Sequence, residues 1–223
     1  MEPADPEQPT VEPTIAQPAP PIPLVLIHGA GAVGQIWQNQ LLAFPRAIAP
    51  NLPGHPTGAG LSTVPDMARW VAEFVSSHDL DRCVLGGYSI GGAVAIEAAL
   101  AAPQRYRGLV LIATGARLRV RQEFFDRLAG DYDAAVEELL RWWFSPQASP
   151  RVVERARAAL WMISPAVVHD DFWAAHQFDA MDRVGEIRTP TLIICGGEDR
   201  LTPVRYSEFL QQQIAGSQLV VIP

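Results

Sequence analysis

The feature that most constrains this chain is a serine between glycines, where an apolar run gives way to a helical stretch. Gly87-Tyr88-Ser89-Ile90-Gly91 follows the strand-like residues 82–87 and opens the alanine-rich residues 90–102. The pattern G-x-S-x-G in this setting predicts a sharp strand-to-helix turn with the serine at strained backbone angles. Its glycines let neighbouring backbone pass without a Cβ clash. The alternative is an ordinary glycine-rich turn with a serine at the surface.

Strand-like and helical segments alternate along most of the chain. Apolar runs typical of strands lie at residues 24–27, 47–49, 82–87, 109–113, 191–195 and 219–222. Segments with helical spacing lie at residues 35–44, 63–77, 90–102 and 204–214. Continuous apolar runs are typical of strands that are buried on both faces. The alternation predicts an α/β protein with a doubly wound, mostly parallel sheet and right-handed crossovers.

One internal segment and the N-terminal segment depart from this alternation. Residues 115–184 have helical patterns only, at 123–128, 134–144, 152–163 and 168–178. We interpret them as a helical cap, which leaves residues 24–114 and 185–223 to form the sheet core. Residues 1–23 are rich in proline and carry only acidic charges, which predicts a disordered leader rather than a signal peptide. A proline-rich docking segment is the alternative for this leader.

Composition and charge limit the possible partners. The chain has 223 residues, of which 48% are hydrophobic and 18% charged, and its net charge is −7. The negative charge and the lack of a basic run argue against nucleic acid. No apolar stretch reaches the roughly 18 residues that a membrane helix needs. We therefore expect a small-molecule substrate as partner, with no nucleic acid and no membrane, and the sequence leaves the oligomeric state open.

The two cysteines, Cys83 and Cys195, both lie in apolar, strand-like runs. The predicted fold places their strands on either side of a third strand, so they should lie about 9–10 Å apart at ~4.8 Å per strand. A disulfide needs Cα atoms within about 7 Å of each other. We therefore expect buried free thiols, a reducing compartment and a cytoplasmic location.

The serine motif predicts nucleophilic catalysis. Ser89 would be the nucleophile, and the positive end of the helix behind it would favour a developing anion. Acyl transfer also needs two N–H donors aimed at the forming oxyanion. Ile90, the residue after the nucleophile, would supply one donor, and Ala30 in His28-Gly29-Ala30-Gly31 is the candidate for the other. The alternative for residues 28–31 is a plain glycine turn.

Serine catalysis of this kind needs an acid that holds a histidine in one tautomer. Asp199 follows the strand-like residues 191–195, so it should lie at the same sheet edge as Ser89. The adjacent Glu198 is the alternative. We expect no metal, because the cysteines and histidines lack metal-ligand spacing. We expect no cofactor either, since the G-x-G-x-x-G pattern at residues 29–34 lacks an acid at the ribose position.

These motifs resemble those of the α/β-hydrolase superfamily, in particular its branch of small bacterial serine esterases, lactonases and C–C bond hydrolases with a helical cap. The resemblance covers residues 24–223, and it includes the order Ser then Asp and a cap after the sixth strand of the family. Asn51-Leu52-Pro53-Gly54-His55 resembles the family's Asp-x-Pro-Gly-His loop. Asn51 stands where relatives usually carry Asp, and Pro56 where they usually carry Gly. A serine nucleophile argues against haloalkane dehalogenase or epoxide hydrolase activity, because such relatives use aspartate there.

The resemblance also implies a catalytic histidine in a glycine-rich loop after residues 219–222, whereas the sequence stops at Pro223. The histidines of the chain lie elsewhere: His28, His55, His78, His169 and His176. We therefore expect a chain that is truncated before its catalytic base. Without a base, Ser89 would be a weak nucleophile at neutral pH. The alternative is a short protein that binds a small molecule without turning it over.

Aromatic residues are concentrated in the predicted cap: Phe124, Phe125, Trp142, Trp143, Phe144, Trp161, Phe172, Trp173 and Phe178. Most of them should pack the cap helices together, and a few would line an apolar pocket over Ser89. The combined prediction is a serine hydrolase that acts on a small apolar carboxylic ester, or a related acyl substrate, through an acyl-serine intermediate. A C–C bond hydrolase or lyase on the same scaffold, and a non-catalytic binding protein, are the alternatives. Arg117, Arg119 and Arg121 form a solvated basic face or, alternatively, recognise a substrate carboxylate.

Overall fold

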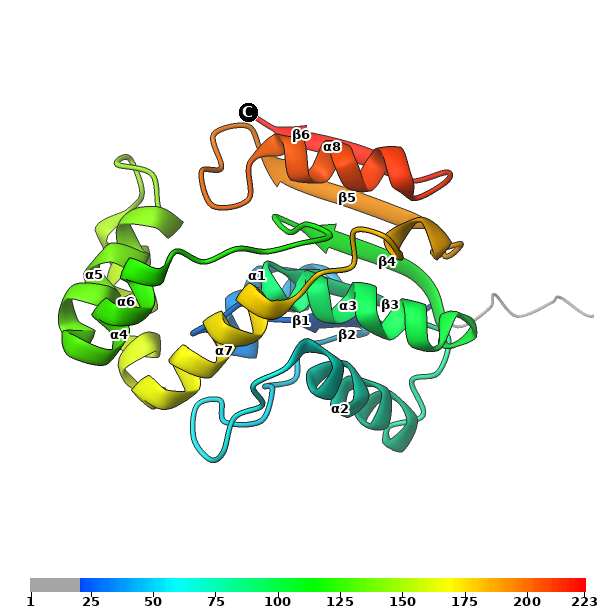
Figure 1. Cartoon of the computed structure of the whole chain (residues 1–223). Helices are drawn as coiled ribbons and strands as arrows, with labels where there is room; N and C mark the ends of the chain where they lie inside the picture. The colour runs from blue at the N-terminus through cyan, green and yellow to red at the C-terminus, as the bar shows by residue number, and fades with distance from the viewer. Residues whose placement is uncertain (1–20) are drawn as a thin grey trace, which may run out of the picture.

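The computed structural model describes residues 21–223, and its centre is a six-stranded, entirely parallel sheet (Figure 1). The strands are β1 (Leu24–Ile27), β2 (Ala47–Ile48), β3 (Cys83–Tyr88), β4 (Tyr106–Ile112), β5 (Thr191–Gly196) and β6 (Gln218–Ile222). Their order in the sheet is β2-β1-β3-β4-β5-β6. The order runs outward from β1 in both directions, which is the doubly wound arrangement predicted from the alternation of strands and helices.

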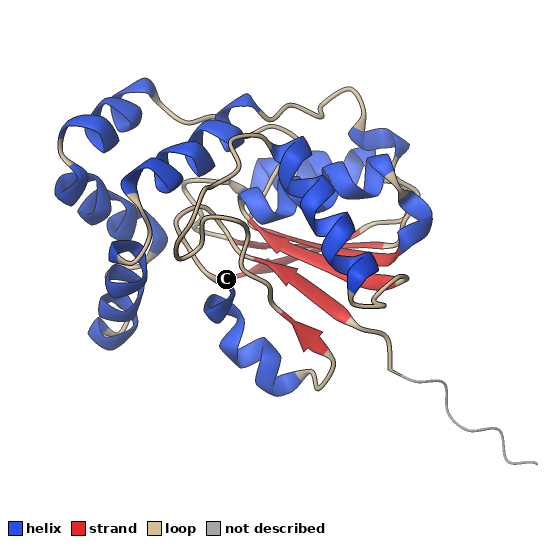
Figure 2. Cartoon of the chain, turned by 90° about the horizontal axis from the view of Figure 1, so that it is seen from below, coloured by secondary structure: helices blue, strands red, loops and turns tan. Residues whose placement is uncertain are grey.

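Helices connect the strands and lie on both faces of the sheet (Figure 2). They are η1 (Gly34–Trp37), α1 (Gln38–Ala43), α2 (Val64–Ser77), α3 (Ile90–Ala101), η2 (Pro103–Arg105), α4 (Gln122–Gly130), α5 (Tyr132–Trp143), α6 (Pro150–Trp161), α7 (Pro165–Gln177), η3 (Val184–Glu186) and α8 (Val204–Gln213). The start of α2 follows from its sequence, because the Thr63 side chain accepts a hydrogen bond of 3.2 Å from the Asp66 amide as an N-cap.

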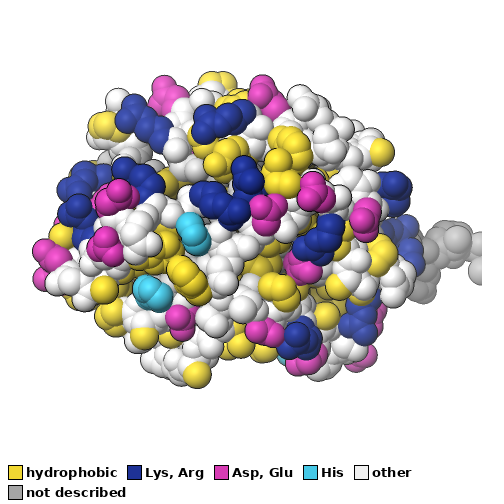
Figure 3. All heavy atoms as spheres, viewed as in Figure 1, with side chains coloured by type: hydrophobic (Ala, Val, Ile, Leu, Met, Phe, Trp, Pro, Cys, Tyr) yellow, Lys and Arg dark blue, Asp and Glu magenta, His cyan; other side chains and the backbone are white. Residues whose placement is uncertain are grey.

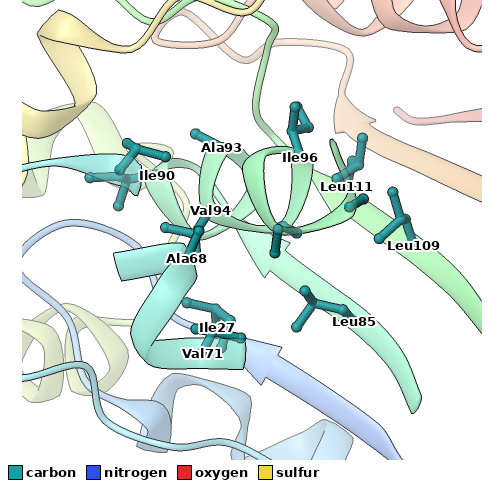
Figure 4. Packing of buried hydrophobic residues seen from close by; sticks show 14 of the residues in the cluster. Ile27, Ala68, Val71, Leu85, Ile90, Ala93, Val94, Ile96, Leu109 and Leu111 are labelled. Carbon is teal, nitrogen blue, oxygen red and sulfur yellow. The ribbon is translucent and has the colours of Figure 1, made fainter. Parts of the chain in front are cut away.

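Helix α3 packs between the sheet and α2, and it is the most buried helix of the core (Figure 4). Apart from Glu97, its residues are apolar or glycine, which is typical of a helix that is buried on most of its surface. Leu85 and Leu111 point toward it from the sheet, Ala68 of α2 lies beside Val94 of α3, and Val71 of α2 belongs to the same cluster. All five side chains are at most 4% exposed. This packing fixes the start of α3, and therefore the turn that carries Ser89.

Four helices, α4 to α7, occupy the interval between β4 and β5, and we call them the cap helices (Figure 1). They share a hydrophobic cluster of their own, which includes Phe124, Leu139 and Leu160. Helix α7 joins this cluster to the sheet core, because Val168 belongs to the cap cluster and Ala174 to the core cluster. Residues 122–177 of the interval predicted to be helical contain these four helices, whereas residues 115–121 and 178–183 are not helical, and α7 packs onto the α/β core.

Several element boundaries differ from those expected. Helices α6 and α7 begin at Pro150 and Pro165, two and three residues before the predicted starts. Proline at the first helical position has a suitable φ and loses no intrahelical hydrogen bond, so it opens these helices rather than preceding them. Strand β4 begins at Tyr106 instead of residue 109, because Tyr106 pairs with Cys83 on β3. Most of the predicted leader, residues 1–20, lies outside the described residues.

Cys83 on β3 and Cys195 on β5 are buried free thiols on either side of β4, as the predicted strand order requires. Burial raises the pKa of the Cys83 thiol to about 11. Within residues 21–223, no helix combines the length and apolarity needed to cross a membrane.

Candidate active site

Ser89 occupies a strained turn between β3 and α3. Its φ of 55° and ψ of −120° are angles that a non-glycine residue rarely adopts. A Cβ at Gly87 would lie 2.0 Å from the carbonyl oxygen of Gly91, and a Cβ at Gly91 would lie 2.5 Å from that of Ile27. The glycines on both sides of the serine are therefore required by the close approach of backbone, as the motif predicted.

Two hydrogen bonds hold this turn in place. The Ser89 amide donates to the carbonyl oxygen of Ile112 at 3.0 Å, and the Thr114 hydroxyl donates to the carbonyl oxygen of Ser89 at 2.7 Å. Both partners come from the end of β4 or directly after it. The strained backbone thus persists because the neighbouring strand determines it from outside.

The loop of residues 28–31 lies directly against this turn. A Cβ at Gly29 would be 2.7 Å from the Tyr88 ring and 3.5 Å from Cβ of Ser89. Within the described part of the chain, the amides of Ala30 and Ile90 donate no hydrogen bond to another protein group. Two free N–H groups beside the serine are what an oxyanion hole needs.

His28 anchors the start of this loop. Its Nδ1 donates to the carbonyl oxygen of Gly29 at 2.9 Å, and its Nε2 accepts from the Leu52 amide at 3.0 Å. Nδ1 carries a proton, whereas Nε2 accepts a hydrogen bond and carries none, so the ring is neutral. Burial lowers the pKa of His28 to about 3, with a further lowering from the nearby His55. His28 is therefore a structural residue.

Asp199 follows β5 and has a fixed orientation. Its Oδ1 accepts from the amides of Leu201 and Thr202 at 2.9 and 2.8 Å, and its Oδ2 accepts from the Thr202 hydroxyl at 2.8 Å. The neighbouring Glu198 is exposed, whereas Asp199 is half-buried. Of the two acids that the sequence left open, Asp199 has the preorganised carboxylate.

Ser89, Ala30 and Asp199 line one cavity of about 1280 Å³. Apolar residues of the segment between β4 and β5 also line it: Leu140, Trp142, Trp143, Phe144, Val153 and Phe172. Polar groups also reach it, among them Arg119, Arg141 and Glu198. The structure therefore brings Ser89, Ala30 and Asp199 into one cavity, which Trp142, Trp143, Phe144 and Phe172 also line. The exposed Trp161 and Trp173 are not among the lining residues.

The five histidines, all within the described residues, lie away from this cavity, since none of them contributes to its lining. His28 and His55 are buried in the loops after β1 and β2. His78 is exposed at the end of α2, and His169 and His176 are partly exposed on α7.

The basic residues 117–121 mostly pair with acids. Arg117 and Arg119 approach Asp179 at 3.7 and 3.0 Å, and Arg121 approaches Glu138 at 3.7 Å. On the face seen in Figure 3, arginines and acids are interspersed. This agrees with a solvated charged face, and Arg119 alone of the three also lines the cavity. In residues 21–223, no group of three or more His, Cys, Asp or Glu side chains is arranged to hold a metal ion.

The loop of residues 51–55 supports residues 28–34. The Asn51 side chain accepts a hydrogen bond of 2.7 Å from the Gly34 amide, so asparagine supplies an acceptor where relatives usually carry aspartate. His55 forms an ion pair of 2.9 Å with Asp171 on α7. Sequence reasoning missed Asp171. A signal existed, because its position falls in the apolar stripe with Val167, Val168, Ala174 and Ala175.

The strand order, the serine turn and the covering helices together define an α/β hydrolase. A family profile with the description "Alpha/beta hydrolase family" matches residues 24–223. The chain therefore belongs to the alpha/beta hydrolase family, as the resemblance predicted.

Similar proteins are hydrolases and esterases. The pimeloyl-[acyl-carrier protein] methyl ester esterase of Neisseria meningitidis is 28% identical over 214 residues, which cover 88% of this chain and 68% of that protein. The enzyme of that name from Vibrio campbellii is 29% identical, covering 89% and 84%. A hydrolase structure from Pseudomonas aeruginosa PA01 has a TM-score of 0.82 at 30% identity, covering 90% and 82%. A thermophilic esterase structure has a TM-score of 0.80 at 34% identity, covering 90% and 80%. The chain is therefore a carboxylic-ester-hydrolase-like enzyme, which confirms that prediction.

Proposed function

We propose that this protein is a serine esterase that cleaves small carboxylic esters with an apolar acyl part through an acyl-Ser89 intermediate. The observation that carries the proposal is that Ser89, held at strained angles, faces the same cavity as Ala30 and Asp199. The names of the Neisseria and Vibrio relatives, both methyl ester esterases, support an ester as substrate.

In the proposed reaction, Oγ of Ser89 attacks the ester carbonyl carbon and its proton passes to a base. The carbonyl oxygen becomes an oxyanion that accepts hydrogen bonds from the amides of Ala30 and Ile90. The C–O bond to the alcohol then breaks, and the base returns its proton to the leaving alkoxide. Water attacks the acyl-serine in the same way and releases the acid.

The base in this scheme is a histidine oriented by the Asp199 carboxylate. None of the five histidines within residues 21–223 lines the cavity. Ile222 and Pro223, by contrast, line it together with Asp199. The Asp199 carboxylate therefore faces the cavity beside the end of β6, where a base would have to meet it.

The apolar wall of the cavity supports an apolar acyl group. Trp142, Trp143 and Phe172 are large side chains that hold an alkyl or aryl group away from water. A second candidate function is non-catalytic binding of a small molecule in this cavity. It is favoured by the positions of the five histidines away from Ser89.

Labelling with a fluorophosphonate probe, followed by peptide mass spectrometry, tests the esterase proposal. We expect a single label on Ser89 when imidazole is supplied as the base, and no label in Ser89→Ala. Ser145→Ala is a matched control, because Ser145 lines the same cavity without lying in the turn. This variant should be labelled like the unaltered chain. A chain that binds apolar esters without any label on Ser89 would support the binding role instead.

A further inference from the structure

Asp171 is a buried acid that connects the cap to the loop beside Ser89. It lies on α7 and is 2% exposed. Its Oδ2 accepts a hydrogen bond of 2.8 Å from the Gly31 amide, 140 residues away in sequence. The same oxygen lies 2.9 Å from Nε2 of His55. One carboxylate oxygen thus joins the cap, residues 28–31 and the loop after β2.

The surroundings of His55 favour its protonated form. Its Nδ1 lies 3.2 and 3.1 Å from the carbonyl oxygens of Leu52 and Pro53, which can only accept, so Nδ1 carries a proton. Burial alone would lower the pKa of His55, but the hydrogen bond and charge of Asp171, together with the two carbonyls, raise it. The nearby His28 is neutral and adds no competing charge.

The held amide is adjacent to the proposed oxyanion donor. Gly31 has a φ of 61°, and its N–H points to Asp171, whereas the amide of the preceding Ala30 has no protein acceptor within the described residues. A Cβ at Gly31 would lie 2.8 Å from the Leu160 side chain, so the cap also packs directly on this residue. The conformation of Ala30 therefore depends on a contact made by the cap.

We propose that Asp171 is a positioning residue: held by His55, its carboxylate fixes the Gly31 amide and thereby orients the Ala30 N–H toward the oxyanion. This inference rests on the proposed function, in which Ala30 donates to the oxyanion. It makes the oxyanion hole conditional on the docking of α7. A removed oxyanion donor typically slows such reactions by about 10²–10³-fold, so a displaced one should cost at least about tenfold.

Two measurements on Asp171→Ala test the proposal. The first is amide hydrogen exchange of Gly31 and Ala30 by NMR on the full chain. The second is the rate constant for labelling of Ser89 by a fluorophosphonate, expressed per folded molecule. The matched control is Asp170→Ala, which removes the neighbouring acid, 40% exposed at its side chain. Asp171→Asn keeps an oxygen for the Gly31 amide, so its exchange protection at Gly31 and its labelling rate should fall less than those of Asp171→Ala. It replaces Asp171→Ala if that variant does not fold.

We expect Asp171→Ala to speed exchange at Gly31 and to slow labelling, each at least about tenfold, while Asp170→Ala changes neither by more than about twofold. Faster exchange with unchanged labelling would overturn the proposal, and so would unchanged exchange. Labelling is measured with imidazole present. If the unaltered chain is not labelled even then, the proposed function fails, and the exchange data alone decide whether Asp171 holds the loop.

Discussion

The Thr114 hydroxyl donates a hydrogen bond of 2.7 Å to the carbonyl oxygen of Ser89, across the gap between the ends of β4 and β3. Thr114 is 1% exposed, so water does not compete for this bond. The bond fixes the peptide group that connects the strained serine to Ile90. A residue 25 positions further along the chain thus helps to hold the candidate nucleophile, together with the amides of Gly92 and Ala93, which donate to the same oxygen.

Thr114→Val should destabilise the protein by roughly 1–2 kcal/mol, because it keeps the shape of the side chain and removes a buried hydrogen bond. It should also slow fluorophosphonate labelling of Ser89. Thr114→Ser keeps the hydroxyl and should retain more of the labelling rate. Urea unfolding and labelling kinetics check both statements, and a faster reaction in the valine variant than in the serine variant would contradict them.

Gly87→Ala should destabilise the protein by at least roughly 3 kcal/mol, since its Cβ would collide with backbone that cannot move freely. Gly130→Ala is the matched control. Gly130 is the last residue of α4, and no atom lies within 4 Å of a Cβ added there. Alanine at this position should therefore stabilise the folded protein by about 0.5–1 kcal/mol. Thermal unfolding of the two variants measures the contrast. Similar stabilities would show that the serine turn tolerates side chains.

Imidazole in solution should accelerate ester hydrolysis by the 223-residue chain. Ser89 lacks a histidine among the residues that line its cavity, and an added base of the same chemistry can take the serine proton. We expect slow release of p-nitrophenol from p-nitrophenyl butyrate, rising with imidazole concentration. The background reaction of imidazole is subtracted with Ser89→Ala. Ordinary enzyme turnover without imidazole would mean that one of the five histidines serves as base after all.

The buried, neutral His28 should make stability depend on pH on the acid side. Its pKa is about 3 in the folded protein against 6.5 in the reference state, so the unfolded chain binds more protons between these values. The contribution of neutral His28 to the free energy of unfolding is fully present above pH 6.5. It is lost, by up to about 1.4 kcal/mol per pH unit, as the pH falls toward 3. Unfolding by urea at several pH values measures this slope. It should be shallower in His28→Gln, and equal slopes would refute the assignment.

The aromatic wall of the cavity should select apolar acyl groups. p-Nitrophenyl butyrate should react faster than the mono-p-nitrophenyl ester of succinic acid, because the carboxylate of the latter would be desolvated against Trp143 and Phe172. Phe172→Ala should reduce this preference. A preference for the charged ester would instead indicate that Arg141, which also lines the cavity, binds a substrate carboxylate.

The sequence alone determined the serine turn and the class of fold. Both depend on neighbours along the chain: two glycines beside Ser89, an apolar run before it and a small-sided helix after it. The same local logic placed Asp199 at the sheet edge, because parallel strands with helical crossovers end on one side. Element boundaries were less certain where a proline can either precede a helix or open it, as at Pro150 and Pro165.

Only the tertiary structure decided how the parts of the site are joined. The contact of Asp171 with Gly31 spans 140 residues, and it exists because α7 packs on the sheet core. Hydrogen bonds from Thr202 orient Asp199 and distinguish it from Glu198 as the candidate acid. These bonds depend on how the loop after β5 folds. Hydrophobic periodicity specifies which face of a segment is buried, but not which distant segment covers it. That choice is made by packing, which is why the sequence predicted Ser89 as the nucleophile and missed Asp171, the acid that contacts the loop beside it.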